Sequence, residues 1–357
     1  MELGFVSLNT PRDLGPAALG RELEARGFES LWVGEHPQLP VAAAAQMPGG
    51  RVGAQKRMWD PLLSLLAAAS ATTSLRIGTA VALPLERELF TFAKEVATLD
   101  QFSDGRLVLG FGVGFRPEFE LSRSIHWADR YRALGDMVAA LDALWTQDES
   151  EHHGEFYDFD PVWSHPKPRQ QPRPPLLAAT TGPKATRECL PWADGWLPGD
   201  AAFRDLPRAV SDFRHQAEEA GRDPDSVRVW SCLATVGDHL PEPLRLKKTV
   251  GRLATYLQGY GDLMVDTNGW DPAVLTAFRA DPVVGSLLGA IDQVATTEQL
   301  EHIATLLPDE WLAPAATGTS AQCVATVREQ LALGADAVIL HGASPTELTP
   351  IVHEYSG

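Results

Sequence analysis

The feature that most limits the fold is a regular alternation of short apolar runs with amphipathic stretches along the chain. Short apolar runs bounded by turn residues are typical of buried strands, and apolar residues every three or four positions are typical of helices. Strict alternation of the two implies parallel strands joined by right-handed crossovers. We predict strands at 2–8, 29–35, 75–83, 106–112, 176–180, 194–199, 226–236 and 336–342.

Amphipathic helices are predicted between these strands, and residues 237 to about 318 are mostly helical and interrupt the rhythm. Eight strands favour a closed (β/α)8 TIM barrel, an α/β fold, over an open doubly wound sheet. The barrel would carry a helical insertion, about 237–318, before its last strand. Because no linker separates two halves of the chain, we expect residues 1–357 to form a single domain. The predicted barrel helices are 14–27, 60–73, 88–103, 130–145, 183–193, 206–221 and 321–335.

Charge and cysteine content exclude several classes of partner. The formal net charge is -17, which opposes binding to nucleic acid or to an anionic membrane. Cys189, Cys232 and Cys323 are widely spaced and odd in number, which argues against a disulfide framework and a zinc site. No apolar run approaches the roughly 20 residues of a membrane span, and residues 1–10 lack a signal-peptide pattern. We therefore expect a cytoplasmic protein with a small-molecule substrate and no metal.

In a barrel of this kind the chemistry lies at the carboxyl ends of the strands. Glu35 and His36 follow the second strand, so we predict an acid–base pair there, with Glu35 orienting His36. The alternative is a hydrogen-bonded histidine beside a solvated glutamate. Three further residues at strand ends are predicted to line a substrate pocket: Ser7, Phe115 and Trp196.

The turn after the predicted strand 176–180 is a candidate anion site. Small residues at a helix start leave backbone N–H groups free, and the helix dipole favours a negative charge there. The alternative is an ordinary strand-to-helix turn. The residues of this turn are Thr180, Thr181, Gly182, Pro183 and Lys184.

Glycines at every second position from Gly110 to Gly114 do not form a dinucleotide fingerprint. That fingerprint requires G-x-G-x-x-G, and the third glycine would fall at Phe115 or Pro117. These glycines need another explanation.

Several motifs together, in order and spacing, resemble the luciferase-like flavin and deazaflavin oxidoreductases. The resemblance covers the first strand to about residue 240, and about 317 to the end. The segment 295–323 is similar to a subgroup described as coenzyme F420-dependent oxidoreductases. The motifs are "GFESLWVGEH" (27–36), "LRIGTAVALPLER" (75–87), "ATLDQFSDGRLVLGFGVGFRPEFE" (97–120), "ATTGPKA" (179–185) and "ADGWLPG" (193–199).

The resemblance implies a cofactor site and a homodimer. The tricyclic ring would rest against a non-proline cis peptide between Ala80 and Val81, and the segment Gly112, Val113 and Gly114 would let the backbone pass close to the ring. The phosphate loop would match Thr181–Lys184, although the family's loop is usually richer in glycine. His36 matches a common active-site histidine of deazaflavin members, where aspartate often stands at the position of Glu35.

Three functions remain open on the sequence. The first is a coenzyme F420-dependent oxidoreductase that transfers a hydride to or from a small organic substrate, with His36 exchanging the proton. The second is an FMN-dependent monooxygenase that uses molecular oxygen. The third is a non-catalytic flavin or deazaflavin-binding protein. The alanine-rich segment 41–50 favours an apolar substrate.

Overall fold

The computed structural model describes residues 3–41, 56–122, 125–180, 183–198, 206–312 and 315–357. A closed parallel barrel forms its centre, in the strand order β9-β11-β1-β2-β3-β4-β7-β8, with β8 pairing back to β9. The predicted (β/α)8 barrel is confirmed, and each predicted strand overlaps one of these. The barrel strands are β1 (Leu3–Ser7), β2 (Ser30–Val33), β3 (Arg76–Ala82), β4 (Leu107–Phe111), β7 (Leu176–Ala178), β8 (Gly195–Trp196), β9 (Arg228–Gly237) and β11 (Ala337–His341).

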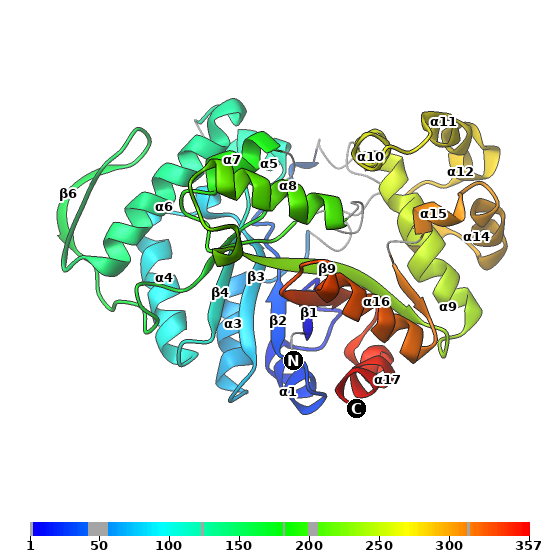
Figure 1. The fold of residues 1–357 in the computed structure, drawn as a ribbon, viewed down its shortest axis with the longest axis horizontal. Helices are drawn as coiled ribbons and strands as arrows, with labels where there is room; N and C mark the ends of the chain where they lie inside the picture. Colours follow the sequence, from blue (N-terminus) through cyan, green and yellow to red (C-terminus); the bar gives the residue numbers. More distant parts are fainter. Residues whose placement is uncertain (1–2, 42–55, 123–124, 181–182, 199–205, 313–314) are drawn as a thin grey trace.

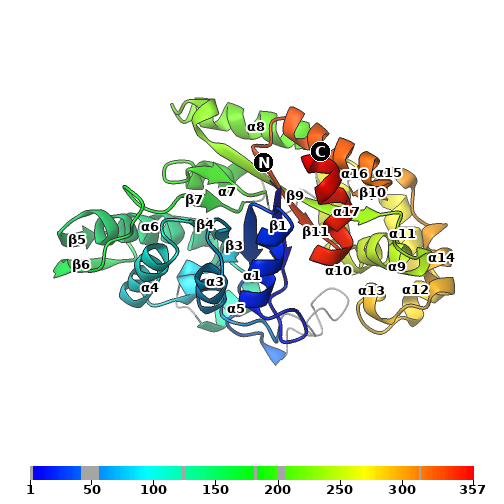
Figure 2. The same ribbon diagram turned by 90° about the horizontal axis from the view of Figure 1, so that it is seen from below.

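Helices cover the outside of the barrel, as Figure 2 shows for the side that carries α1, α3 and α4. Helix α3 is capped at its start, since the Asp60 side chain accepts a hydrogen bond from the Leu63 N–H and Pro61 opens the helix. The covering helices are α1 (Pro16–Ala25), α3 (Pro61–Ser70), α4 (Leu89–Phe102), α6 (Arg130–Thr146), α7 (Pro183–Cys189), α8 (Leu206–Glu219), α16 (Ser320–Ala332) and α17 (Pro345–Ser356), with α5 (Arg116–Ser122), η3 (Pro84–Glu86), η4 (Trp127–Asp129) and η6 (Pro224–Ser226) in the connections.

The predicted helical insertion follows β9 and packs around an apolar cluster of its own. Figure 1 shows its helices gathered on one side of the barrel. Its last segment, β10 (Ala316–Gly318), adds to the sheet by pairing with the end of β9. The helices are α9 (Glu242–Leu246), the π-helix η7 (Lys247–Gly251), α10 (Arg252–Asn268), α11 (Pro272–Ala280), α12 (Pro282–Ser286), α13 (Ile291–Val294), α14 (Thr297–Ala304) and α15 (Asp309–Leu312).

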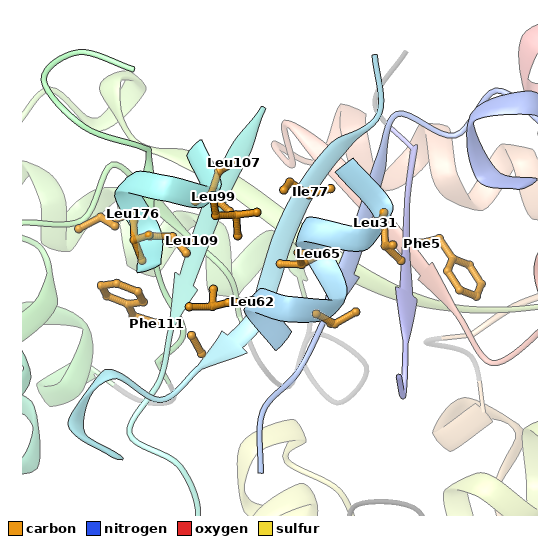
Figure 3. Packing of buried hydrophobic residues seen from close by; sticks show 14 of the residues in the cluster. Phe5, Leu31, Leu62, Leu65, Ile77, Leu99, Leu107, Leu109, Phe111 and Leu176 are labelled. Carbon is orange, nitrogen blue, oxygen red and sulfur yellow. The ribbon is translucent and has the colours of Figure 1, made fainter. Parts of the chain in front are cut away.

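Two apolar layers follow from the alternation of side chains along each strand. One set faces the helices and includes Phe5, Leu31, Ile77 and Leu109, which Figure 3 shows together with Leu62 and Leu65 of α3 and Leu99 of α4. The other set faces the barrel interior, and it comprises Val6, Trp32, Ala80, Val81, Val108, Leu177, Ala179, Leu197, Trp230, Cys232, Ala337 and Ile339. This division fixes which residues can reach the barrel mouth.

The structure adds one antiparallel hairpin that the sequence patterns did not predict. Strands β5 (Glu149–His153) and β6 (Asp158–Trp163) pair with each other and project from the barrel at the end away from the insertion (Figure 1). His152 and His153 both lie in β5, where the His152 ring meets Asp136 of α6 and the His153 ring meets Asp158 of β6. Phe159 and Val162 of β6 pack against the outer core, but they are separated by Asp160 and Pro161, so the segment has no regular apolar alternation.

Within the described residues, no helix is long and apolar enough to cross a bilayer. In the same part of the chain, no group of three or more histidine, cysteine, aspartate or glutamate side chains is placed to hold a metal ion. Cys189, Cys232 and Cys323 are free thiols.

The Glu24 carboxylate ties α1 to the turn before β3. Its Oε1 accepts hydrogen bonds from the backbone N–H groups of Thr73, Ser74 and Leu75 at 2.9, 2.6 and 3.1 Å. Burial alone would raise the pKa of Glu24, but the hydrogen bonds from Ser74, Thr73 and Leu75 outweigh it and lower the pKa from 4.5 to about 2. The ionised carboxylate therefore stabilises the fold.

We expect Glu24→Gln to lower the melting temperature at pH 7 by roughly 1–2 °C, for a loss of about 1 kcal/mol at this half-exposed position. The folded pKa lies below the unfolded one, so the stabilisation is complete above pH 4.5 and is lost as the pH falls towards 2. In thermal melts, the difference in melting temperature between variant and wild type should therefore shrink as the pH is lowered from 4.5 towards 2. Glu301→Gln, in an exposed part of α14, is the matched control; a pH-independent difference for Glu24→Gln would contradict the prediction.

Candidate active site

The barrel interior is closed below its mouth by two tryptophans. The Trp32 and Trp230 rings lie 4.9 Å apart between centroids, and the Trp32 indole donates to Ser30 Oγ at 2.8 Å. The neighbouring strands make room with glycine, because a Cβ on Gly78 would lie 2.5 Å from the Trp32 ring. A ligand entering from the carboxyl ends of the strands therefore meets an aromatic floor, with Ala80 above Gly78 on the same face of β3.

Glu35 and His36 follow β2 and point in opposite directions. Leu31 and Val33 of this strand face the helices, whereas Trp32 faces the interior. Continued alternation along the extended chain sends Glu35 outward and His36 to the mouth. The His36 side chain is half-buried, with 22% of its surface exposed.

The carboxylate that His36 meets belongs to Glu118 of α5. The distance from His36 Nδ1 to Glu118 Oε1 is 2.8 Å, and the Glu118 side chain is 1% exposed. Gln38 supports this arrangement, because its Nε2 donates to the Glu118 carbonyl at 3.1 Å. A donor N–H at His36 Nδ1 leaves Nε2 as the nitrogen available to a ligand.

The expectation that Glu35 orients His36 is therefore corrected. The Glu35 carboxylate accepts from the Leu83 N–H at 2.7 Å and pairs with Arg87 at 2.7 Å, and it is buried on the helix side of β2. Burial alone would lower the pKa of Arg87, but the Glu35 charge holds it above the ordinary arginine value. Glu35 thus anchors the residues after β3 to β2, and any catalytic role for it stays a prediction.

Strand β3 carries the expected irregularity at the mouth. The Ala80–Val81 peptide bond is cis, and the pairing of β3 with β4 shifts between Thr79 and Ala82. Both Ala80 and Val81 are half-buried although they belong to the interior cluster. A small, partly exposed apolar surface therefore lies at the end of β3, beside His36.

The glycines of β4 have a different immediate reason from the one expected. A Cβ on Gly110 would lie 2.2 Å from the Thr79 carbonyl oxygen, and one on Gly112 would lie 2.5 Å from Val81 Cγ2. Gly114 has a φ of +73°, which side chains rarely adopt. These glycines accommodate the irregular end of β3, so they support the proposed ring surface from behind. Val113 beside them is half-buried and packs against the outer core.

The predicted phosphate loop is only partly within the described residues, since Thr181 and Gly182 lie outside them. The Thr180 hydroxyl is buried and already bonded: it accepts from the Trp196 indole at 3.1 Å and lies 3.0 Å from Thr186 Oγ1. Pro183 begins α7, and the Lys184 side chain is 89% exposed. Thr180 therefore holds α7 on the barrel, and a phosphate contact through its hydroxyl is not favoured.

Two of the predicted pocket residues face away from the mouth or are already bonded. Trp196 stacks on Phe213 of α8, with ring centroids 4.8 Å apart, and is 1% exposed in the layer outside the barrel. Ser7 is buried and accepts a hydrogen bond from the Asn9 N–H at 2.9 Å. Phe115 is half-buried directly before α5. Of these three residues, Phe115 alone is partly exposed near the carboxyl ends of the strands, as a pocket residue must be.

A cavity of about 670 Å³ lies outside the barrel, between α6 and α7. An ion-paired network crosses it, in which Arg173 bonds both Asp142 and Asp194. None of the predicted site residues lines this cavity.

Comparison with known proteins decides the family. A family model described as "Luciferase-like monooxygenase" matches residues 16–337. The chain belongs to this family. The resemblance that the motifs suggested is thereby confirmed, and members of the family are oxidoreductases and monooxygenases.

Relatives of this luciferase-like protein include an uncharacterised protein and a flavin-dependent monooxygenase. An uncharacterised protein of Mycobacterium tuberculosis is 36% identical over 260 residues, covering 65% of this chain and 89% of the relative. The oxygenase component of the flavin-dependent trigonelline monooxygenase of Acinetobacter baylyi is 31% identical over 162 residues, covering 44% of this chain and 41% of that protein.

Solved structures share the fold. The coenzyme F420-dependent tetrahydromethanopterin reductase of Methanopyrus kandleri has a TM-score of 0.74 at 18% identity, and 99% of each chain is covered. A long-chain alkane monooxygenase has a TM-score of 0.71 at 15% identity, covering 100% of this chain and 91% of that one. Proteins with this fold thus include a coenzyme F420-dependent reductase and an alkane monooxygenase.

Glu118 is the functional residue that sequence reasoning missed. It stands in "RPEFE", where Phe119 points into the core and Glu120 pairs with Arg116 at the surface. A glutamate between a proline and a phenylalanine gives no sign of complete burial. The one signal in the sequence was its position: Glu118 follows the fourth predicted strand and His36 follows the second, so both lie at the same end of the barrel.

Proposed function

We propose that the protein is a coenzyme F420-dependent oxidoreductase that transfers a hydride between the deazaflavin and a small organic substrate. The observation that carries the proposal is the pair of His36 and the fully buried Glu118, 2.8 Å apart, beside the Ala80–Val81 surface. A histidine held by a buried carboxylate next to a flat apolar surface suits an oxidoreduction in which a proton accompanies the hydride.

The residues present fit a planar, partly polar ring. Ala80 and Val81 offer a small, half-buried apolar surface, and Gly34 brings the β2 backbone close to it, since a Cβ there would lie 3.2 Å from the Ala80 carbonyl oxygen. Gln38 Oε1 is buried and has no hydrogen-bond partner among the described residues. A buried acceptor of this kind suits an N–H group of a ring system.

His36 and Glu118 would divide the work between proton exchange and orientation. When bound, the deazaflavin supplies hydride chemistry. Glu118 accepts the Nδ1 proton, which fixes the ring plane and leaves Nε2 towards the mouth. Nε2 then takes the proton of a substrate hydroxyl, or returns one to a carbonyl oxygen. The aromatic floor of Trp32 and Trp230 limits the depth to which water and substrate enter.

The alternative is an FMN-dependent monooxygenase that uses molecular oxygen. The 31% identity to the trigonelline monooxygenase component favours it, as does 30% identity over 155 residues to the FMNH2-dependent dimethylsulfone monooxygenase of Pseudomonas putida, covering 43% of this chain and 42% of that one. Both assignments use the same end of the barrel.

A titration of the purified protein with coenzyme F420 and, separately, with FMN distinguishes the two. Binding is followed through the fluorescence of each cofactor in matched buffer. We expect F420 to bind at least tenfold more tightly than FMN. Tighter binding of FMN would replace the proposal with the monooxygenase, and oxygen consumption would be measured next. Binding of neither cofactor would contradict both enzyme assignments.

Three expectations remain predictions beside this proposal: a homodimer, a cytoplasmic location and a single domain over 1–357. The expectation of an apolar substrate rested on segment 41–50, of which residues 42–50 lie outside the described part of the chain.

A further inference from the structure

A second polar group reaches the barrel mouth from β11, two strands away from His36. In the closed barrel β11 and β2 both neighbour β1. Ala337 and Ile339 face the interior, so alternation directs His341 to the mouth as well. The strand register puts His341 level with Val6 and Trp32, so His36 lies two strands across and four residues further along, roughly 16 Å away at the usual strand spacing and rise. The half-exposed Ala80–Val81 surface is on the other side of β2.

The insertion places a guanidinium on His341. Arg252, at the start of α10, has its Nη2 3.4 Å from His341 Nε2. A Cβ on Gly342 would lie 3.5 Å from Arg252 Nη1, and the guanidinium carbon is 5.4 Å from the Tyr256 ring centroid. Burial raises the pKa of the interior Cys232 thiol to about 12, and the charge of Arg252 opposes the rise. The guanidinium therefore acts on the barrel interior.

Arg252 differs from its neighbours in having no counterion. Lys248, one turn earlier, is 3.2 Å from the Glu347 carboxylate. Arg87, which is also half-buried, pairs with Glu35, Asp60 and Glu95. Among the described residues no carboxylate forms an ion pair with Arg252, in a protein whose net charge is -17. A half-buried cation without a counterion at the mouth is suited to an anionic ligand.

We propose that Arg252, backed by His341, binds a carboxylate group of the substrate at the barrel mouth. This inference rests on the proposed function, since it assigns the substrate class of the same site. The planar guanidinium fork matches a carboxylate, and a single charge suits a monoanion. Between the two histidines Leu8 exposes 58% of its surface, which provides an apolar contact for the body of the substrate. The substrate class is therefore an organic acid with an apolar body, which modifies the expectation of an uncharged substrate.

The test uses hexanoate as the probe and hexan-1-ol as its neutral match, titrated calorimetrically into the full-length protein saturated with whichever cofactor binds. We expect wild type to bind hexanoate at least tenfold more tightly than hexan-1-ol. Arg252→Gln should remove that preference, and Arg252→Lys should retain part of it because the charge remains without the fork. Arg279→Gln, which removes an exposed arginine of the same insertion, should leave it unchanged within twofold.

Equal affinity of wild type for the two probes, or an unchanged preference in Arg252→Gln, would overturn the proposal. Melting temperatures show whether each variant is folded. If Arg252→Gln does not fold, the preference of Arg252→Lys for hexanoate over hexan-1-ol is the deciding measurement. Repeating the titration without cofactor shows whether Arg252 binds the substrate or an anionic part of the cofactor. If hexanoate binds only when the cofactor is absent, the cofactor occupies Arg252, which would contradict the proposal. An Arg252-dependent preference in a protein that binds neither cofactor would support the subsite while contradicting the proposed function.

Discussion

His36→Asn is expected to lower kcat/KM for the proposed F420-dependent reaction by about 10²–10⁴-fold, the usual contribution of a positioned acid or base. Asparagine can still donate a hydrogen bond to Glu118 but cannot exchange a proton near neutral pH. The measurement is steady-state turnover of the substrate found by screening with the bound cofactor. The dissociation constant of the cofactor should change by less than about threefold, because His36 is assigned to the substrate and not to the ring surface.

His152→Asn is a closely matched control. Its Nε2 lies 2.8 Å from an aspartate, Asp136, and its side chain is 16% exposed, so it resembles His36 in partner and burial. It belongs to the β5–β6 hairpin, away from the barrel mouth. Turnover by His152→Asn should equal that of wild type. If His36→Asn kept more than a tenth of wild-type kcat/KM, proton exchange would have to be assigned to another group.

The barrel was predictable because its strands leave a strong signal. Each is an apolar run flanked by an amphipathic helix with recognisable ends, such as the Asp60 cap and the left-handed Gly27 after α1, with φ +85°. The β5–β6 hairpin gave no such signal, since polar residues make up most of β5 and a proline interrupts β6. Only Phe159 and Val162 pack on the core, at a spacing that fits neither a regular strand nor a helix.

The error at Glu35 was avoidable from the sequence. Adjacent residues of an extended chain point to opposite faces, so a barrel in which Trp32 faces the interior cannot direct both Glu35 and His36 to the mouth. The identity of the true partner was not available in the same way. Glu118 reaches His36 across 82 residues of chain, and only the packing of α5 on the barrel end brings the two together.

The glycine run shows a similar limit. The sequence indicates that the β4 backbone must pass close to something, but it does not say to what. The structure identifies the irregular end of β3, which approaches Gly110 through a carbonyl oxygen and Gly112 through a side chain. The cofactor surface and the glycines behind it are therefore one structural unit, which makes a stability measurement informative about the site.

Gly110→Ala is expected to cost about 3 kcal/mol or more of folding free energy, a fall of roughly 4 °C or more in melting temperature. The added Cβ would lie 2.2 Å from the Thr79 carbonyl oxygen and 3.1 Å from Leu197 Cδ2. The first contact is with backbone, so no side-chain rotation relieves it. Thr79 must move, and with it the adjoining Ala80–Val81 surface, so cofactor binding should weaken in the same variant.

Two further glycine-to-alanine variants give a series of decreasing steric clash. Stability is measured by thermal melts and cofactor binding by titration. Gly112→Ala meets a valine methyl group at 2.5 Å, and we expect an intermediate loss because that side chain can shift. Gly285→Ala meets nothing within 4 Å at an exposed position inside the helix α12, so its stability should be unchanged or slightly higher. A Gly110→Ala protein that melted within 2 °C of wild type and bound cofactor normally would show that β3 yields easily at Thr79. The irregular end of β3 would then be too soft to hold a ring in place, and the cofactor surface would have to be sought elsewhere at the mouth.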